Sequence, residues 1–492
     1  MLFVVKLYPE ITIKSRPVRR RLIRLLRRNL RKLLRELDEN ISVTGEWDVI
    51  DIQTESDDEV LVGRISERLR CTPGIAQFQL VKRYALQDLD AIAEVCRQSY
   101  AAQLAGCTFA VRCKRHGNHP FTSVDVERHV GAILLKQTEA AGVRLTNPEV
   151  TVQLEIRQDH VHVVEQQQSG IGGFPLGSQD PVLSLISGGF DSAVSSYLCI
   201  RRGLLTHYCF FNLGGRAHEL AVKEVALYLW MKFGASHQVR FITVPFEPVV
   251  AEILNRVDNS QMGVILKRMM LRAASRLADQ LGIQALVTGE AVAQVSSQTL
   301  PNLVIIDSVT DKLLLRPLIV AGKQDIIDLA RSIGTEQFSS QIPEYCAVIS
   351  DRPTTRARPE RIAREEQQFN MQLIDQAVAE ARVQLVSSVA NDLAGPGRKI
   401  PVVSSLEPGV TLIDIRHPDE RERAPLAVGD HQDLEFLQVP FYQLQTYLDA
   451  RDRKASYLLY CDKGMMSRLH AAHLADQGFT EVGVYQPDLQ RQ

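Results

Sequence analysis

The sequence predicts an α/β protein built from several domains. The chain has 492 residues, which is more than one hydrophobic core usually supports, so we expect three or more domains. Between residues 178 and 350, short apolar runs alternate with helical patterns. Such alternation predicts a doubly wound parallel sheet with its ligand at the carboxyl ends of the strands.

Composition limits the function classes. The net charge is −1, with 45% hydrophobic and 23% charged residues, which is typical of a globular protein rather than one basic throughout. No apolar run reaches transmembrane length and the first residues do not resemble a signal peptide, so we expect a cytoplasmic protein without a membrane partner. The eight cysteines form no C-x-x-C pair. In a cytosolic chain we therefore expect reduced thiols, no zinc ribbon, no cysteine-ligated iron–sulfur cluster and no protein-ligated metal site among them.

The first elements are a strand at residues 2–7 and a helix from Lys14 to Arg35. This helix carries eleven Lys or Arg residues, no acidic residue, and leucines at helical spacing, so one face is apolar and the other strongly basic. We predict that the basic face binds a phosphate backbone. A solvated face and a membrane-surface helix are the alternatives. The predicted RNA-binding residues here share one face: Arg20, Arg24, Arg27 and Arg31.

Two α+β segments make up the N-terminal third. Val49–Thr54 and Val60–Leu69 read as a strand and a helix, and residues 1–62 then have the element order of a ferredoxin-like unit. Residues 63–167 carry the next expected elements: strands Thr108–Lys114, Val150–Ile156 and Val161–Val164, and helix Ser123–Ala140.

The second segment contains FAVRCKRHGNHPFTSVDVERHVGAIL. This string resembles the THUMP domain, an RNA-binding module of tRNA-modifying enzymes. The resemblance implies that Arg112, Lys114 and Arg115 face RNA, together with His116 and His119. Taken singly, the two histidines also fit polar loop positions.

A strand, a tight turn and a helix follow one another from Pro181 to Gly203. Val182–Ile186 is an apolar run of buried-strand length, and Ser187-Gly188-Gly189-Phe190-Asp191-Ser192 comes directly after it. Glycines allow close approach of a ligand, and the free N–H groups of a helix start suit phosphate. The glycines alone also fit a plain connecting turn. The string SGGFDS resembles the PP-loop of ATP pyrophosphatases, which adenylate an oxygen and release pyrophosphate.

The resemblance implies ATP and Mg²⁺ as cofactors. Asp191 is suited to magnesium or to orienting the α-phosphate, and Lys267 and Lys323 are suited to neutralising phosphate. TGEAVAQVSSQT, from Thr288 to Thr299, resembles the second nucleotide loop of the family. The implied ATP contacts are Leu185, Ile186, Ser187, Gly188, Gly189, Asp191, Ser192, Lys267, Gly289, Gln298 and Lys323. The other elements expected in this domain, residues 178–350, are Leu204–Phe211, Glu219–Phe233, Val239–Phe246, Ile265–Leu281, Ala285–Thr288, an apolar run at Val304–Ile306, and Gln324–Ile333.

A linker and a small domain complete the chain. Residues 351–405 form the linker, with a helix expected from Glu360 to Val386. Residues 406–492 alternate short strands with helices, and SYLLYC delivers Cys461 into the turn CDKGMMS before a helix from Ser467. Amide N–H groups at such a turn favour a thiolate, so we expect a lowered thiol pKa. With Asp414 and Arg416, this pattern resembles a rhodanese domain; a degenerate docking domain is the alternative.

The order of these segments, with the phrase IPEYCAVISDRPTTRA around Cys346, resembles the tRNA 4-thiouridine synthetase family. The resemblance implies that ATP adenylates O4 of a tRNA uridine, at the eighth position. It also implies that Cys461 receives persulfide sulfur from a cysteine desulfurase and that Cys346 is a functional, resolving thiol. Asp191, Cys346 and Cys461 are thus the implied catalytic residues.

The same resemblance implies two further partners. One is a sulfur-carrier protein of thiamine synthesis, and the other is an electron donor such as ferredoxin or thioredoxin. Two alternatives stay open: a nitrogen-transferring PP-loop synthetase, for which a glutaminase domain would be expected, and an RNA-binding adaptor with an inactive ATP site.

Overall fold

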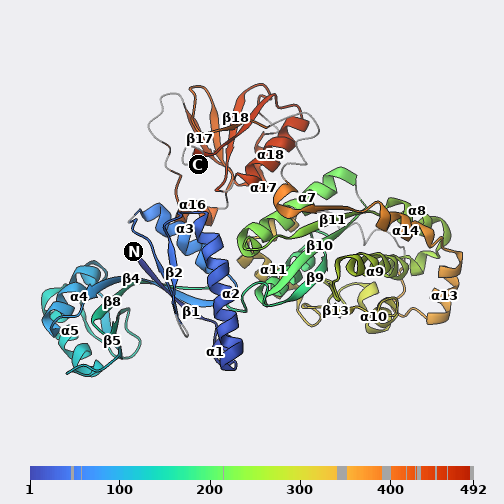
Figure 1. The fold of residues 1–492 in the computed structure, drawn as a ribbon. Helices are drawn as coiled ribbons and strands as arrows, with labels where there is room; N and C mark the ends of the chain where they lie inside the picture. Colours follow the sequence, from blue (N-terminus) through green and yellow to red (C-terminus); the bar gives the residue numbers. More distant parts are fainter. Residues whose placement is uncertain are drawn as a thin grey trace. The chain divides into compact units, whose positions relative to one another are not determined.

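The computed structural model divides the chain into two compact units, Met1–Pro175 and Leu176–Gln492, shown in Figure 1. It describes residues 1–45, 49–56, 58–213, 215–340, 352–389, 400–416, 418–426, 428, 434–448, 451–462 and 464–487. Among the described residues, no helix is long and apolar enough to cross a membrane.

The first unit is built on one sheet of eight strands in the order β2-β3-β1-β4-β8-β7-β5-β6. Its centre is β4 (Ile75–Ala85), which pairs antiparallel with both β1 (Leu2–Leu7) and β8 (His160–Ser169). The sequence reading missed β4 and thereby the continuity of the sheet. The other strands are β2 (Ser42–Thr44), β3 (Val49–Gln53), β5 (Thr108–His116), β6 (Gly142–Val143) and β7 (Val150–Arg157).

Helices cover this sheet in two groups, each over its own core. In the first group, α2 (Arg16–Arg35) and α3 (Glu59–Arg70) pack against β1, β3 and β4. The other buries α4 (Leu89–Leu104) and α5 (Ser123–Gln137) against β5, β7 and β8. A short helix, α1 (Pro9–Thr12), precedes α2. The boundary expected between residues 62 and 63 falls inside α3.

The basic helix has the amphipathic form that its leucines predict. Leu22, Leu26, Leu30 and Leu34 are buried in the core, because residues three or four apart share one face of a helix. The arginines lie on the opposite side. The helix begins at Arg16 rather than Lys14, with a proline in its first turn, where proline is tolerated.

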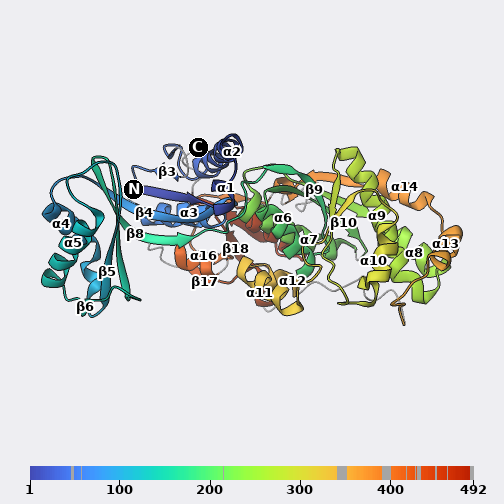
Figure 2. The same ribbon diagram turned by 90° about the horizontal axis from the view of Figure 1, so that it is seen from below.

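The second unit contains a six-stranded sheet in the order β13-β12-β9-β10-β11-β14. Its first five strands are parallel and β14 is antiparallel. Figures 1 and 2 show α6, α7 and α11 on one face, and α8, α9 and α10 on the other. The strands are β9 (Gln179–Leu185), β10 (Leu204–Asn212), β11 (Arg240–Pro245), β12 (Ala285–Val287), β13 (Leu313–Leu315) and β14 (Arg382–Leu385). The helices are α6 (Phe190–Arg201), α7 (Gly215–Leu229), α8 (Glu247–Arg256), α9 (Met262–Leu281), α10 (Leu300–Asp307), α11 (Lys323–Ile333) and α12 (Glu336–Ser339).

The structure corrects two assignments in this unit. Val304–Ile306 belongs to α10, since a short apolar run fits a helix as well as a strand, and a proline opens this helix. The expected single helix from Glu360 to Val386 is instead α13 (Pro359–Gln368), α14 (Gln372–Ala379) and β14. β14 pairs with β11, so the parallel sheet ends in an antiparallel strand.

The C-terminal segment forms a separate, all-parallel sheet in the order β15-β19-β18-β16-β17. These strands are β15 (Val402–Val403), β16 (Thr411–Asp414), β17 (Glu435–Gln438), β18 (Ser456–Tyr460) and β19 (Glu481–Tyr485). Three helices connect them: α16 (Pro418–Arg423), α17 (Phe441–Leu448) and α18 (Met465–Asp476).

A largely buried ion-pair cluster joins α13 to α9. Both carboxylate oxygens of Glu366 accept from Arg268, at 2.7 and 3.0 Å, and from Arg272, at 2.5 and 2.9 Å. Burial opposes the charge, but the two guanidinium groups outweigh it and lower the pKa of Glu366 to about 2. Removing one member of a buried pair leaves the others uncompensated.

We expect Glu366→Gln to loosen α13. Losing this anchor costs about 3 kcal/mol, so amide hydrogen exchange in α13 should accelerate about 100-fold. Because the folded pKa lies below the ordinary value of 4.5, the stabilisation is present above that value and is lost as the pH falls toward 2. Exposed Glu360 of the same helix provides the control Glu360→Gln. Equal exchange in both variants would contradict the anchoring role.

Candidate active site

The loop Ser187–Ser192 connects β9 to α6 at the carboxyl end of the sheet. Gly188 has φ of 83°, a left-handed conformation that favours glycine. The backbone N–H of Ser187 donates to the Ser192 hydroxyl at 3.1 Å, and that hydroxyl donates to the Gly189 carbonyl at 3.1 Å. The serine side chain therefore closes the turn, and the amides at the start of α6 stay directed toward an anion.

Gly289 fits against this loop because it has no side chain. A Cβ at this position would lie 2.7 Å from the carbonyl carbon of Asp191 and 2.8 Å from the backbone nitrogen of Ser192. The turn after β12 thus packs backbone to backbone on the first turn of α6. By contrast, a Cβ on Gly189 would meet only the Ser187 hydroxyl oxygen at 3.7 Å, an ordinary contact.

A cavity of about 430 Å³ opens between these two turns and α9, a volume typical of small-molecule sites. Nine of the predicted ATP contacts line it: Leu185, Ile186, Ser187, Gly189, Asp191, Ser192, Lys267, Gly289 and Gln298. The other two lie beside it. The Gly188 carbonyl accepts from the Ser339 hydroxyl at 2.9 Å, and the Lys323 ammonium reaches Asp191.

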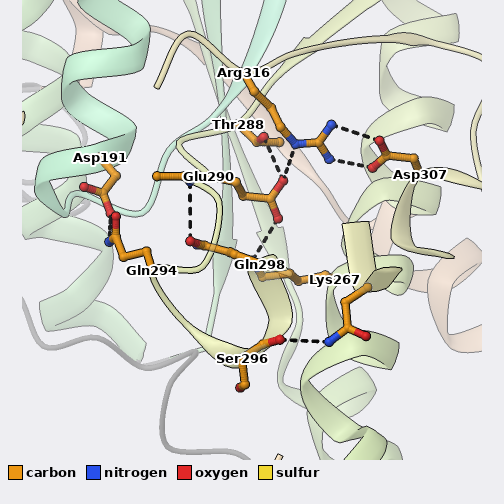
Figure 3. Close-up of polar contacts among 11 residues, drawn as sticks. Asp191, Lys267, Thr288, Glu290, Gln294, Ser296, Gln298, Asp307 and Arg316 are labelled. Carbon is orange, nitrogen blue, oxygen red and sulfur yellow. Dashed lines mark hydrogen bonds and ion pairs between the residues drawn. The ribbon is translucent and has the colours of Figure 1, made fainter. Parts of the chain in front are cut away.

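The Asp191 carboxylate already has a donor on each oxygen. Lys323 Nζ lies 3.0 Å from Oδ1, and the Gln294 amide nitrogen donates to Oδ2 at 2.7 Å; Figure 3 shows the second contact. Gln294 follows Ala293, whose φ is 63°, and such strain in a non-glycine residue is found at functional sites.

A resident magnesium ion does not fit the residues present. Each Asp191 oxygen already accepts from a side chain, Lys323 or Gln294, and among the described residues no group of three or more His, Cys, Asp or Glu side chains is arranged to hold a metal ion. Asp191 instead directs the Lys323 ammonium, as its ion pair with that residue indicates.

An ion-pair network forms the opposite wall. Lys267 Nζ lies 2.8 Å from Glu290 Oε1, and Arg316 Nε donates to Glu290 Oε2 at 2.7 Å, as drawn in Figure 3. Burial opposes the charge of Glu290, but Lys267 and Arg316 lower its pKa to about 2. Lys267 therefore faces the cavity as an ammonium group held by a carboxylate.

Sequence reasoning missed several residues of this cavity. Glu290 and Gln294 lie inside the TGEAVAQVSSQT segment. The polar residues at alternate positions of this segment are the signal that could have identified them. His218 and Phe210 also line the cavity, with ring centroids 4.9 Å apart. Burial lowers the pKa of His218, which favours a neutral imidazole. Nothing in the local sequence distinguishes these two from core residues.

Cys346 lies outside the described residues, but the chain on both sides of it is described. On one side Ser339 bonds the Gly188 carbonyl. On the other side Pro353 and Thr354 line the cavity, and the Thr354 carbonyl accepts from Asn302 at 2.9 Å. Residues flanking Cys346 therefore contact the PP-loop or its cavity on each side.

Cys461 follows β18, as predicted, and the Ser467 backbone N–H donates to its sulfur at 3.4 Å. The expected lowering of the thiol pKa is wrong for this structure. Burial dominates and raises the pKa of Cys461, although the Ser467 contacts act in the opposite direction. Burial therefore favours the thiol form, and greater exposure or a nearby cation would favour the thiolate.

The predicted pair Asp414 and Arg416 forms a buried ion pair beside Cys461. Arg416 Nη2 lies 2.7 Å from Asp414 Oδ2, and Nη1 lies 3.1 Å from Asp462, the residue after the cysteine. Both Asp414 and Arg416 are buried. The pair therefore ties the end of β16 to the cysteine turn.

The predicted RNA-facing residues of the first unit are not all alike. Arg112 and Lys114 are exposed on β5. Arg115 lies on the opposite face of this strand, which it shares with the core residue Cys113. Arg115 donates to the Gly117 carbonyl at 3.0 Å and contacts His119 at 3.1 Å, so it supports the loop. On α2, Arg20, Arg24 and Arg31 are exposed and Arg27 is half-buried.

The fold and cavity define an α/β nucleotide-binding protein of the PP-loop class, carried with a THUMP-type domain. Its sequence matches the ferredoxin-like domain of the ThiI proteins at residues 3–79, the THUMP domain at 86–164, and the family described as thiamine biosynthesis protein (ThiI) at 177–371. The tRNA sulfurtransferase of Azotobacter vinelandii is 55% identical over 99% of this chain and 100% of its own length. That of Pseudomonas putida is 53% identical with the same coverage.

The chain therefore belongs to the tRNA sulfurtransferase family. Among solved structures it is similar to a 4-thiouridine synthetase in complex with RNA and ATP. That match has a TM-score of 0.69 and 26% identity, and covers 78% of this chain and 99% of the other.

We expect Gly289→Ala to destabilise the second unit and Gly189→Ala to leave its stability unchanged. The first substitution forces a Cβ into the Asp191–Ser192 backbone and should cost about 2 kcal/mol, or roughly 4–8 °C in Tm. The second has room in the protein. Thermal unfolding followed by circular dichroism measures both. A similar Tm for the two variants would contradict the close packing.

Proposed function

We propose that this protein is an ATP-dependent tRNA sulfurtransferase that converts uridine 8 of tRNA to 4-thiouridine. The observation that carries the proposal is the cavity between the PP-loop and the Gly289 turn, which places amides and Lys267 around one volume. Relatives named tRNA sulfurtransferase match the chain over nearly its whole length, and a similar structure holds both RNA and ATP.

The first step of the proposed reaction is adenylation. The uracil O4 attacks the α-phosphorus of ATP, the bond to the β-phosphate breaks, and pyrophosphate leaves with the electron pair. Amides at the start of α6, Lys267 and Lys323 stabilise the charge on the phosphates. Asp191 acts by holding Lys323, at 3.0 Å. Magnesium enters as an ion carried by the triphosphate.

The second step is sulfur transfer. The terminal sulfur of a Cys461 persulfide attacks C4 of the activated uridine. The C4–O bond then breaks, and AMP leaves with the electron pair of that bond. A Cys346 thiolate then attacks Cys461 Sγ, so that the persulfide bond breaks, the sulfur stays on the base and a Cys346–Cys461 disulfide forms. An external electron donor of the ferredoxin or thioredoxin type reduces this disulfide before the next cycle.

The proposal includes three further partners. A cysteine desulfurase loads Cys461, the C-terminal domain acting as a rhodanese-like persulfide carrier. A sulfur-carrier protein of thiamine synthesis is a second acceptor, in keeping with the thiamine biosynthesis family match at residues 177–371. The exposed arginines of α2, with Arg112 and Lys114, hold the tRNA backbone.

Each alternative function leaves part of the observed site without a role. An RNA-binding adaptor has no need of the Lys267 and Lys323 ion pairs around the cavity. A nitrogen-transferring synthetase has no need of a cysteine bonded by the first turn of a helix. Pyrophosphate release that depends on added tRNA separates the enzyme from the adaptor.

We expect the two cysteines to fail at different steps. In a reaction with desulfurase, cysteine, ATP and tRNA, Cys461→Ser should accept no sulfur at that position, and Cys346→Ser should accept it without completing turnover. Mass spectrometry of alkylated peptides and of tRNA nucleosides measures each step. Cys209→Ser, a buried cysteine of β10, is the control for thiol loss. Thiolation by Cys346→Ser at the wild-type rate over many turnovers would refute the resolving role.

A second prediction concerns the basic helix. Arg20 and Arg24 are exposed on one face of α2, so changing both to Glu should weaken tRNA binding about tenfold or more and lower the slope of log Kd against log salt by about 2. The double variant Arg358→Glu/Arg364→Glu changes two exposed arginines of the second unit by the same charge. If both double variants have the same salt slope, α2 is a solvated face.

A further inference from the structure

Glu290 is a carboxylate in the wall of a cavity suited to phosphate. It follows β12, lines the cavity, and is 8% exposed. An acidic side chain repels a triphosphate, so its presence needs a physical reason. The residues around it provide one.

Each Glu290 oxygen is held by a cation from a different element. Oε1 accepts from Lys267 of α9, and Oε2 accepts from Arg316, which follows β13, and from the Thr288 hydroxyl at 3.1 Å. Arg316 in turn uses both terminal nitrogens on Asp307, at the end of α10. The four side chains form the chain Lys267–Glu290–Arg316–Asp307, shown in Figure 3.

This arrangement has a consequence for nucleotide binding. When a triphosphate attracts the Lys267 ammonium, Glu290 loses part of the charge that compensates it. A buried carboxylate without a partner is costly, and it takes up a proton instead. Arg316 remains on the side of Glu290 away from Lys267, and Asp307 fixes the guanidinium there.

We propose that Glu290 is a positioning residue for Lys267, and that Arg316, fixed by Asp307, keeps Glu290 ionised when Lys267 engages the triphosphate. The inference rests on the proposed contact between Lys267 and ATP. It predicts that wild-type protein binds ATP without protonating Glu290. Among the described residues, Lys267 and Arg316 are the charged groups that pair with this carboxylate.

The test measures proton uptake on ATP binding, in the absence of tRNA, by calorimetry in buffers of different ionisation enthalpy. At about pH 6, a buried carboxylate deprived of its partners is protonated. Arg316→Met should therefore take up close to one more proton than wild type. Glu290→Gln/Arg316→Met should lose that excess, and the comparison cancels the titration of ATP itself. Arg316→Lys, which keeps the cation, should behave as wild type.

Two controls keep the outcomes distinct. Lys267→Met should weaken ATP binding at least tenfold; unchanged affinity would refute the proposed Lys267 contact itself. If Lys267→Met weakens binding but a folded Arg316→Met takes up no extra proton, or the double variant takes up as many, the role of Arg316 is wrong.

The single variant Glu290→Gln tests the positioning role even if Arg316→Met does not fold. Loss of positioning should raise the Kd for ATP about tenfold. Simple removal of a repelling charge would lower the Kd, and a lower or unchanged value overturns the inference.

Discussion

The rest of the site depends on one close contact, that of Gly289 with the backbone of Asp191 and Ser192. Two turns after neighbouring parallel strands, β9 and β12, meet there without an intervening side chain. The carboxyl ends of parallel strands lie at one edge of a sheet, which brings such turns together. Because the backbones touch, Gln294 reaches Asp191 and Glu290 faces α9. The cavity is a consequence of this contact.

Charge in the cavity is arranged in pairs rather than as a field of one sign. Lys323 is paired with Asp191, and Lys267 with Glu290. Each ammonium group thus has a fixed direction before a ligand arrives, which reduces the entropy lost on binding. In the proposed ATP complex the acids carry negative charge near the phosphates, so their second partners, Gln294 and Arg316, matter as much as the lysines. We propose that they hold the acids when the lysines turn to ATP.

The strongest local signals of the sequence correspond to the best predictions. The basic helix was predicted from the spacing of its leucines, and the strand before Ser187 from the glycine-containing turn that follows it. Each signal lies within a short stretch of the sequence. β4 and β13 were missed. β4 mixes apolar residues with polar ones such as Gln79, which is buried and donates to the side chains of Gln153 and Gln167, and β13 has only three residues. Glu290 and Gln294 were missed because their roles depend on contacts with distant parts of the chain. Their partners lie on α9, on α6 and directly after β13, and no local sequence pattern contains them.

At Cys461, the amide of the helix start and the burial of the sulfur act on the thiol pKa in opposite directions. The helix start places an amide on the Cys461 sulfur as the sequence predicts, yet burial outweighs it and the thiol pKa rises. A buried thiol is a poor nucleophile and is also protected from oxidation. If the proposed persulfide forms on Cys461, its loading therefore requires that this turn become more exposed when a donor or the activated uridine is present. On the two sides of residues 341–351, which lie outside the described part of the chain, Ser339 bonds the Gly188 carbonyl and the Thr354 carbonyl accepts from Asn302 beside the cavity. In the proposed reaction, the Cys461 turn is therefore the part of the structure that has to rearrange before its sulfur can reach the activated base.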